Sequence, residues 1–476
     1  MPGFNQSQQA ILHLSWIAFF LTFVSWFNFA PFNTTLASTM FLDEGQIRVL
    51  MIANVALTIP ARIVIGSLVD ALGPKRVFVS ILIYSGAVSF MFALAQDFND
   101  LLIARLLMGV AGAGFVVGIK MIAEWFPRES MGFAQGIYAG WGNFGAAAAV
   151  FGLPLIASFF APEMGWRIAS FLTGAACLLW AFGYFLLARD KEGPRNGFRL
   201  GMEQAIEVSS KGDLFLQIIM LVPVYTALGF LVFKLTIPPA VWLTPSQFWS
   251  ILFVFSGLFA WNAVTCVRSN LDNLASPSQP ERDYAFKQIL ILSLVYALTF
   301  GSELAVISMF PEFLENTFAF SVTTAGVLGS CFAAFNLITR PCGGLLADKL
   351  GRRRVLFFLV ANAGICYWLM SYITSAWPVN VALGLAVVCS ILIQTGNGAC
   401  FSMVPLIRRD LTGQLAGLAG AYGNVGAVLF LTVLTFVDAS TFFFFISGFA
   451  AFVTICIVFL DSFDKPHSSF NNKRGA

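Results

Sequence analysis

Long apolar segments dominate the chain and predict helices that cross a membrane. An α-helix of about 20 apolar residues spans the hydrocarbon core of a bilayer, which is about 30 Å thick. Six such segments lie in the first part of the chain, two in its middle and six in its last part. The predicted spans are residues 11–32, 47–71, 77–96, 101–126, 131–158, 166–188, 214–237, 248–267, 288–310, 321–347, 354–374, 379–404, 412–436 and 440–460.

Polar stretches at 189–213 and 268–287 separate the three groups of spans. We therefore predict an all-α membrane protein with 6 + 2 + 6 spans, in which two parallel six-helix halves flank an extra pair of helices. The predicted division is an N-terminal half at 1–188, a linker at 189–287 with a two-helix transmembrane insert at about 214–267, a C-terminal half at 288–460 and a cytoplasmic tail at 461–476.

The basic residues predict which ends of the spans face the cytoplasm. Alternate connections, from 33–46 onward, contain neither Lys nor Arg, whereas the connections between them are basic. Cytoplasmic loops are enriched in Lys and Arg, so we expect both termini to be cytoplasmic. The connection 238–247 within the insert is uncharged, which favours two true spans there.

The composition agrees with a membrane protein and gives no sign of a cofactor. Of the 476 residues, 58% are hydrophobic and 11% are charged, against about 25% charged in soluble proteins. There are two histidines, near the ends, and the eight cysteines lie mostly in apolar stretches without CxxC spacing. We therefore expect no metal, no cofactor and no nucleic-acid partner.

One motif occurs twice, 278 residues apart, at the end of a span in each half. The shared positions are Arg62, Gly66, Asp70, Gly73 and Arg76 in the first copy and Arg340, Gly344, Asp348, Gly351 and Arg354 in the second. Each copy joins an apolar helix to a glycine turn and a basic cluster. We expect the Gly and Asp residues of both copies to control how the halves move against each other.

A second repeat supports two homologous halves. Residues 132–145 align with 413–426 at a shift of 281, and the alignment pairs Asn143 with Asn424. The nearly constant shift indicates parallel copies of six spans each. Such repeats are typical of transporters whose substrate site lies at the midplane between the halves.

Arg62 and Arg340 lie eight residues before Asp70 and Asp348, which is about 12 Å along a helix and near the bilayer midplane. Structural pairing with acids is the simpler interpretation, but acids are scarce within the spans. Unpaired buried charge is costly, so a mobile anion is favoured as the partner. The planar fork of guanidinium suits a flat oxyanion such as nitrate or nitrite.

Other polar and aromatic residues fall at the same depth. Phe115, Tyr296 and Phe300 are either core packing or a dry cage around an anion, to which the tyrosine hydroxyl could donate. Asn143 and Asn424 are either substrate contacts or bonds between helices.

Three further charged residues lie within the spans. Glu303 is either a structural hydrogen-bond partner or a proton-coupling group. Lys120 and Glu124 are four residues apart, and we expect a local ion pair between them.

These repeats resemble signatures of a known family. The loop motif is similar to that of the major facilitator superfamily, and residues 139–145 and 420–426 resemble the two nitrate signatures of its nitrate/nitrite porters. The segment 299–306 is most similar to cyanobacterial uptake porters. The insert at 214–267 is a departure, since the twelve-span bacterial members lack it.

The resemblance implies roles for individual residues. Arg62 and Arg340 would bind the anion, and Phe115 and Phe300 would sandwich it. Tyr296 and Asn143 match the family's remaining site residues. Asn424 is the counterpart of Asn143 in the second half.

The expected function is therefore uptake of nitrate and nitrite across a bacterial inner membrane by a monomeric, alternating-access transporter. Moving each unit charge against the potential costs about 2.3 kcal/mol per 100 mV, so coupling is required. Proton symport and nitrate/nitrite antiport both remain open, as does exchange of another oxyanion such as an organic phosphate. The sequence contains no nucleotide loop or catalytic constellation that would favour a membrane enzyme or sensor.

Overall fold

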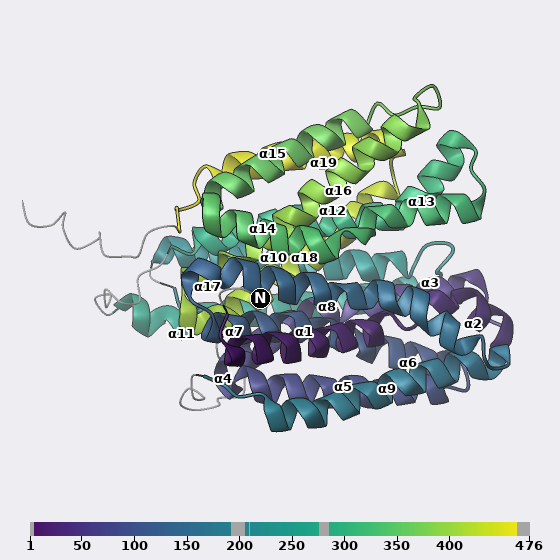
Figure 1. Ribbon diagram of the computed structural model, residues 1–476, viewed down its shortest axis with the longest axis horizontal. Helices are drawn as coiled ribbons and strands as arrows, with labels where there is room; N and C mark the ends of the chain where they lie inside the picture. The colour runs from purple at the N-terminus through teal and green to yellow at the C-terminus, as the bar shows by residue number, and fades with distance from the viewer. Residues whose placement is uncertain (1–3, 192–204, 209, 276–284, 464–476) are drawn as a thin grey trace, which may run out of the picture.

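The computed structural model describes residues 4–191, 205–208, 210–275 and 285–463, and these contain helices but no strands. The helices form two bundles that lie side by side with similar axes (Figure 1). One bundle is the N-terminal half and the other is the C-terminal half, as the duplicated sequence predicted. The all-α fold with two six-span halves and an insert is thus confirmed.

The N-terminal half consists of α1 (Gln6–Phe27), η1 (Ala30–Phe32), α2 (Asn33–Thr39), α3 (Glu44–Ala56), α4 (Thr58–Leu72), α5 (Pro74–Leu94), α6 (Phe98–Met108), η2 (Gly109–Ala113), α7 (Gly114–Trp125), α8 (Arg128–Ala157) and α9 (Pro162–Leu187). The insert consists of α10 (Lys211–Lys234) and α11 (Pro245–Ala275). The C-terminal half consists of α12 (Lys287–Phe318), α13 (Val322–Ala334), α14 (Asn336–Leu350), α15 (Arg352–Met370), α16 (Val379–Phe401), α17 (Val404–Ile407), η4 (Arg409–Leu411), α18 (Thr412–Leu434) and α19 (Ala439–Ile457).

Thirteen helical segments in the described part of the chain are long and apolar enough to cross a membrane. They correspond to all the predicted spans except 321–347, where α13 and α14 meet at Phe335. The equivalent segment of the first half is likewise divided, with α3 and α4 meeting at Leu57. In both halves the midplane arginine lies in the second helix of the divided pair.

The insert lies against the C-terminal half. Helix α10 packs against α11 and α18. The Tyr422 hydroxyl on α18 donates to the Met220 carbonyl at 2.8 Å, and Lys234 donates to the Leu431 carbonyl at 3.3 Å. These contacts leave one side of α11 exposed, with large apolar side chains such as Trp249 and Phe253 on it, as expected for a helix that faces lipid.

The halves meet where glycines allow helices to approach closely. Helix α4 packs against α18, and α14 packs against α8. A methyl group at Gly66 would overlap the Gly413 carbonyl, and one at Gly344 would overlap the Gly132 carbonyl. The repeated glycines therefore form the crossings between the two halves.

The two loop motifs turn at equivalent glycines. Gly73 has φ 86° and Gly351 has φ 96°, a backbone region that residues with a side chain rarely adopt. Each turn joins the second helix of a divided pair to the next helix, α5 or α15. We call the end of the molecule that carries both turns the turn end.

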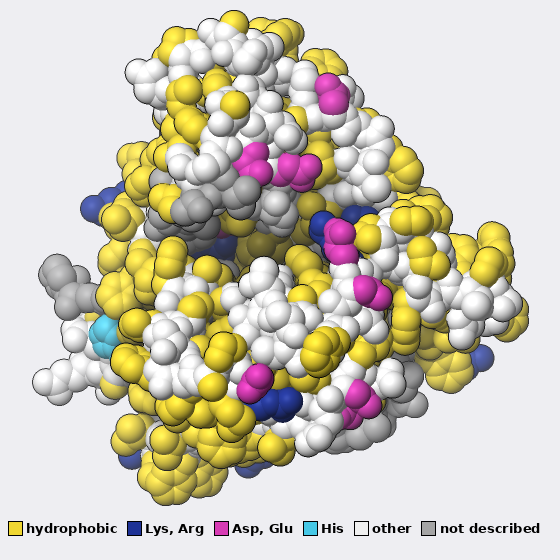
Figure 2. Space-filling model, turned by 90° about the vertical axis from the view of Figure 1, so that its right-hand side faces the viewer, with side chains coloured by type: hydrophobic (Ala, Val, Ile, Leu, Met, Phe, Trp, Pro, Cys, Tyr) yellow, Lys and Arg dark blue, Asp and Glu magenta, His cyan; other side chains and the backbone are white. Residues whose placement is uncertain are grey.

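The opposite end is open. Figure 2 views the right-hand end of Figure 1, where α2, α3 and α13 lie, and its surface is deeply hollowed between the two groups of helices. The helices are closely packed at the turn end and separate towards the hollow. The hollow thus separates the two halves at the end opposite the turns.

Candidate functional site

The two midplane arginines come together at one aromatic ring. Arg62 on α4 and Arg340 on α14 are each 1% exposed. Their guanidinium carbons each lie 5.6 Å from the centre of the Phe300 ring. The Arg62 guanidinium is also 5.6 Å from the Phe115 ring. Arginines 278 residues apart in the sequence therefore share one buried site.

Flat aromatic walls surround these charges. The rings of Phe115 and Tyr296 are 6.2 Å apart with planes 3° from parallel, and those of Tyr296 and Phe300 are 5.0 Å apart and 5° from parallel. Phe401 meets the Tyr296 ring edge-on at 4.6 Å. The Tyr296 side chain interacts with both guanidinium groups. We call Arg62, Arg340, Phe115, Tyr296 and Phe300 the central site.

Arg62 is held by neutral groups. Its Nε donates to the Gly112 carbonyl at 3.3 Å, and its Nη1 donates to the Gly420 carbonyl at 2.6 Å. No carboxylate among the described residues forms an ion pair with it. Its positive charge is therefore balanced by no acidic side chain of the described chain.

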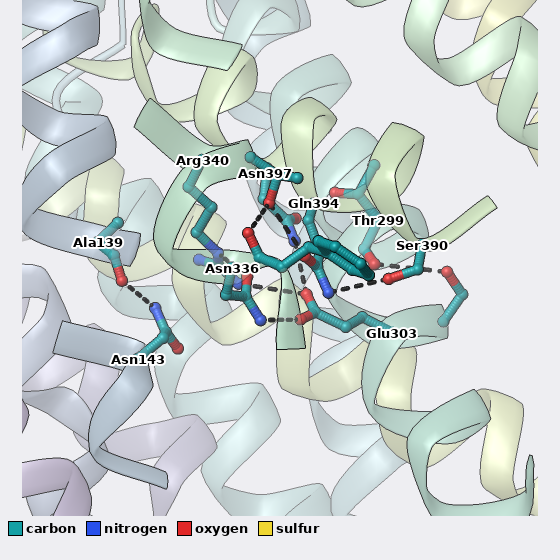
Figure 3. Close-up of polar contacts among 12 residues, drawn as sticks. Ala139, Asn143, Thr299, Glu303, Asn336, Arg340, Ser390, Gln394 and Asn397 are labelled. Carbon is teal, nitrogen blue, oxygen red and sulfur yellow. Dashed lines mark hydrogen bonds and ion pairs between the residues drawn. The ribbon is translucent and has the colours of Figure 1, made fainter. Parts of the chain in front are cut away.

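Arg340 is paired, in contrast to Arg62. Its Nη2 lies 3.2 Å from Oε2 of Glu303, and its Nε donates to the Asn336 Oδ1 at 2.7 Å. Asn336 donates to the other Glu303 oxygen at 2.7 Å, and Asn397 donates to Oε2 at 2.8 Å. Figure 3 shows these groups around the carboxylate, and we call the four residues the glutamate network.

Within the part of the chain that the structure describes, structural pairing with an acid, the simpler interpretation of the two arginines, thus applies to Arg340 and not to Arg62. Two guanidinium groups and one carboxylate give the site a net charge of +2 − 1 = +1. The site is buried, so this excess is weakly screened and attracts an anion.

The two repeat asparagines differ in their surroundings. The Asn143 Nδ2 donates to the Ala139 carbonyl of its own helix at 2.7 Å (Figure 3). Asn424 is fully buried, and neither polar atom of its amide has a hydrogen-bond partner among the described residues. It lies one turn after Gly420, whose carbonyl holds Arg62, and so on the same helix face. The structure therefore leaves Asn424 with unused polar atoms beside the central site.

Sequence reasoning missed three residues of this region, namely Asn336, Asn397 and Phe401. Asn336 lies four residues before Arg340, a spacing that places both on one helix face. Asn397 belongs to a short polar run in the otherwise apolar α16. Both features were visible in the sequence, but nothing there connected them to Glu303.

The predicted gating residue Asp70 crosses between the halves at the turn end. Its carboxylate accepts the N–H groups of Gly413 and Gln414 at 2.9 and 2.8 Å, in the first turn of α18. Such N–H groups have no partner within the helix, and the helix start favours negative charge. Lys120 lies 3.1 Å from the same carboxylate. Lys120 on α7 therefore faces an acid on α4 that its spacing to Glu124 did not indicate, and the predicted pair of Lys120 with Glu124 stays a prediction.

Asp348 makes the equivalent contact in the other direction. It accepts the N–H of Phe133 on α8 at 3.0 Å and pairs with Arg352 at 2.7 Å. Arg352 in turn donates to the Arg128 carbonyl at 2.6 Å. The two loop motifs thus hold the halves together at the turn end.

Comparisons with known proteins agree with the fold. A family model described as "Major Facilitator Superfamily" matches residues 15–279 and 292–476. The "Nitrate/nitrite transporter NrtP" of Picosynechococcus sp. is 41% identical over 461 residues, covering 91% of this chain and 86% of that protein. The protein of the same name from Nostoc punctiforme is 40% identical over 477 residues, covering 97% and 93%. The solved structure of the human organic anion transporter MFSD10 aligns with a TM-score of 0.64 at 13% identity, covering 95% of this chain and all of that one, which supports the fold.

Proposed function

The chain belongs to the major facilitator superfamily and, within it, to the nitrate/nitrite porters, and we propose that it takes up nitrate and nitrite by alternating access. It is accordingly a transporter and not an enzyme. The observation that carries the substrate proposal is the pair of buried arginines that share the Phe300 ring. Two relatives with at least 40% identity are named as transporters of these anions.

The anion sits between Arg62 and Arg340 and balances the net positive charge there. A guanidinium group binds a flat oxyanion through two parallel N–H groups. Phe115 and Phe300, both nearly parallel to Tyr296, provide flat apolar walls that leave little room for a bulky substrate. Tyr296 donates through its hydroxyl.

The two asparagines of the sequence repeat complete this binding site for the anion. Asn424 donates with the amide that has no partner in the described chain. Asn143 donates to the anion once its amide has turned away from the Ala139 carbonyl.

Alternating access uses the contacts at the turn end as its gate. The structure is hollowed at the end opposite the turns (Figure 2), and Asp70 and Asp348 join the halves at the turn end. We assign the turn end to the cytoplasm of a bacterial inner membrane, with both termini on that side and the apolar outer surface in the bilayer, because the connections there are basic. One chain provides both arginines, so a monomer suffices. The gating residues are Gly66, Asp70, Gly73, Gly344, Asp348 and Gly351.

Uptake is driven by symport with protons. The buried Glu303 beside Arg340 is the group that would take up a proton. Nitrate/nitrite antiport is the alternative, because one anion then leaves for each that enters and no net charge moves. The same arginine pair would serve an exchanger of another small oxyanion.

The test is nitrate uptake into proteoliposomes that contain the purified full chain, with and without an inward proton gradient. Arg62→Lys and Arg340→Lys keep the positive charge but remove the two parallel N–H groups of the guanidinium, so both abolish uptake. Arg48→Lys is the matched control, because Arg48 is exposed and pairs with Glu44 at the surface. Full activity in both central variants, or no nitrate movement in the wild type, would disprove the proposal.

The driving force is read from the same vesicles. Accumulation that requires the proton gradient establishes symport, whereas uptake that appears only with nitrite loaded inside establishes exchange. Competition by inorganic phosphate at the concentration of nitrate would indicate a different oxyanion as the substrate.

A further inference from the structure

The glycine crossings establish which residues of α1 and α12 correspond. In the first half the carbonyl of Phe20 lies where a methyl group at Gly145 would be, and in the second half the carbonyl of Ala297 takes the same place at Gly426. The two glycines are equivalent in the sequence repeat. Helices α1 and α12 are therefore related by a shift of 297 − 20 = 277 residues.

This correspondence shows that Glu303 has no acidic counterpart in the first half. Trp26 occupies the position equivalent to Glu303, since 303 − 277 = 26. The Trp26 Nε1 donates to the Asn54 carbonyl at 3.1 Å. The two arginines thus differ in that Arg340 has a carboxylate of the protein, Glu303, as its partner.

Hydrogen-bond donors surround the Glu303 carboxylate. Three N–H donors, from Arg340, Asn336 and Asn397, converge on its carboxylate, and the residue is 2% exposed. The titratable and charged side chains that act on it from α12 and the helices around it are Arg340, Tyr296 and Tyr367. Each of the three donors favours a carboxylate over a carboxylic acid.

Glu303 resembles the proposed substrate in shape and charge. A carboxylate is flat, carries one negative charge and accepts from guanidinium, as nitrate does. An anion that reaches Arg340 must share that group with Glu303, and two buried negative charges at one guanidinium repel each other. Protonation of Glu303 removes the repulsion and releases Arg340.

Asn397 is placed to serve both forms of Glu303. Its Nδ2 donates to the carboxylate, and its Oδ1 is buried with no partner in the part of the chain that the structure describes. A protonated Glu303 has an O–H to donate, and a half-turn of the Asn397 amide would present Oδ1 to it. The amide can therefore exchange its donor role for an acceptor role without leaving the site.

We propose that Glu303 competes with the transported anion for Arg340. In this proposal Asn397 is a positioning residue that sets the pH at which Glu303 takes up a proton and releases Arg340. The inference rests on the proposed function, since it takes nitrate as the anion. One proton from the hollow bonds to a Glu303 oxygen as one anion binds to Arg340, so the site keeps its charge of +1. Binding of the anion and of the proton thus promote each other.

The test is calorimetric titration of nitrate into the purified full chain in lipid nanodiscs between pH 5.5 and 8.5. In the wild type, linkage to one proton makes the Kd rise about tenfold per pH unit at the alkaline end. Glu303→Gln removes the competitor, so its Kd is independent of pH and at least as low as that of the wild type at pH 5.5.

Variants of α16 separate the role of Asn397 from general packing. Asn397→Leu removes a donor to the carboxylate, which favours protonation, so the rise in Kd begins at a higher pH. Asn397→Ser keeps a group that donates and accepts, and it restores the wild-type profile in part. Gln394→Leu is the control, because Gln394 is also a buried amide of α16 but donates to Phe332 and Ser390. It leaves the profile unchanged.

Each contrary result has one meaning. A wild-type Kd that does not change with pH, or a Glu303→Gln Kd more than tenfold above that of the wild type at pH 5.5, overturns the competition while nitrate binding stands. An Asn397→Leu profile equal to that of Gln394→Leu overturns the role of Asn397. Absence of nitrate binding to the wild type at every pH overturns the proposed function itself.

Discussion

At the scale of single residues, the two central arginines differ in what their removal would leave behind. Arg340 is paired with Glu303, and both are almost fully buried. Arg62 donates to carbonyl groups, which carry no net charge. Loss of Arg340 therefore leaves a buried carboxylate without its cation, whereas loss of Arg62 leaves only neutral acceptors.

We expect Arg340→Gln to lower the free energy of unfolding by about 3 kcal/mol, the usual cost of breaking a buried ion pair from one side. Adding Glu303→Gln to the same chain restores most of this loss, because no charge is then left unpaired. Arg62→Gln has a clearly smaller effect. Denaturant unfolding in detergent measures all four proteins. Equal losses for the two arginine variants, or no recovery in the double variant, would contradict this account.

Replacement of Asn424 should change anion binding and protein stability in opposite ways, because its amide has no partner in the described chain. A buried polar group without a partner costs about 1–3 kcal/mol, so Asn424→Leu, which has a similar volume, is at least as stable as the wild type. The same change removes a donor to the anion, and we expect the KM for nitrate uptake to rise at least tenfold. Unfolding curves and uptake kinetics check the two parts. Asn143→Leu is the comparison, because that amide already has a partner in Ala139.

At the scale of helices, the halves move against each other at glycine crossings. Helices α4 and α18 touch through backbone at Gly66 and Gly413, and α14 and α8 touch at Gly344 and Gly132. At these crossings the helices meet through backbone, with no long side chain between them. The crossings can therefore separate and close again as units.

A single methyl group at such a crossing should disturb the closed gate. In Gly66→Ala the new group would overlap the Gly413 carbonyl, so the turn end cannot close fully and uptake falls at least tenfold. Gly183→Ala on α9 is the control, because nothing lies within 4 Å of the added group. It should leave uptake unchanged and raise stability by about 0.5–1 kcal/mol. Uptake by Gly66→Ala at the control level would show that the crossing has room to adjust.

At the scale of the whole molecule, duplication made much of the fold predictable. Arg62 and Arg340 occur at the same depth because each half repeats a divided pair of helices of 13 and 15 residues, and the structure brings both arginines to one ring. What the two halves do not share could not be predicted in this way. Asn397 reaches Glu303 across 94 residues, and Lys120 on α7 lies 3.1 Å from the carboxylate of Asp70 on α4. These contacts depend on which helices face one another, and local spacing carries no information about that.

The closed turn end depends on charges that cross between the halves in both directions. Asp70 binds the start of α18, and Asp348 binds α8 and Arg352. Asp70→Asn keeps the size of the side chain but removes the charge that favours a helix start and pairs with Lys120. We therefore expect Asp70→Asn to shift the population towards a molecule that is open at the turn end.

Spin labels at the exposed residues Arg76 and Leu350 report this shift, because they lie beside the two turns. The labelled chain carries a replacement of the exposed Cys342, so that the labels report the turn end. Asp70→Asn and Asp348→Asn each lengthen the distance between the labels, and the double variant lengthens it most. Asp438→Asn is the control, because Asp438 caps the start of α19 at the surface and accepts the Thr441 N–H of that same helix. Unchanged distances in both single variants would mean that the glycine crossings alone keep the turn end closed.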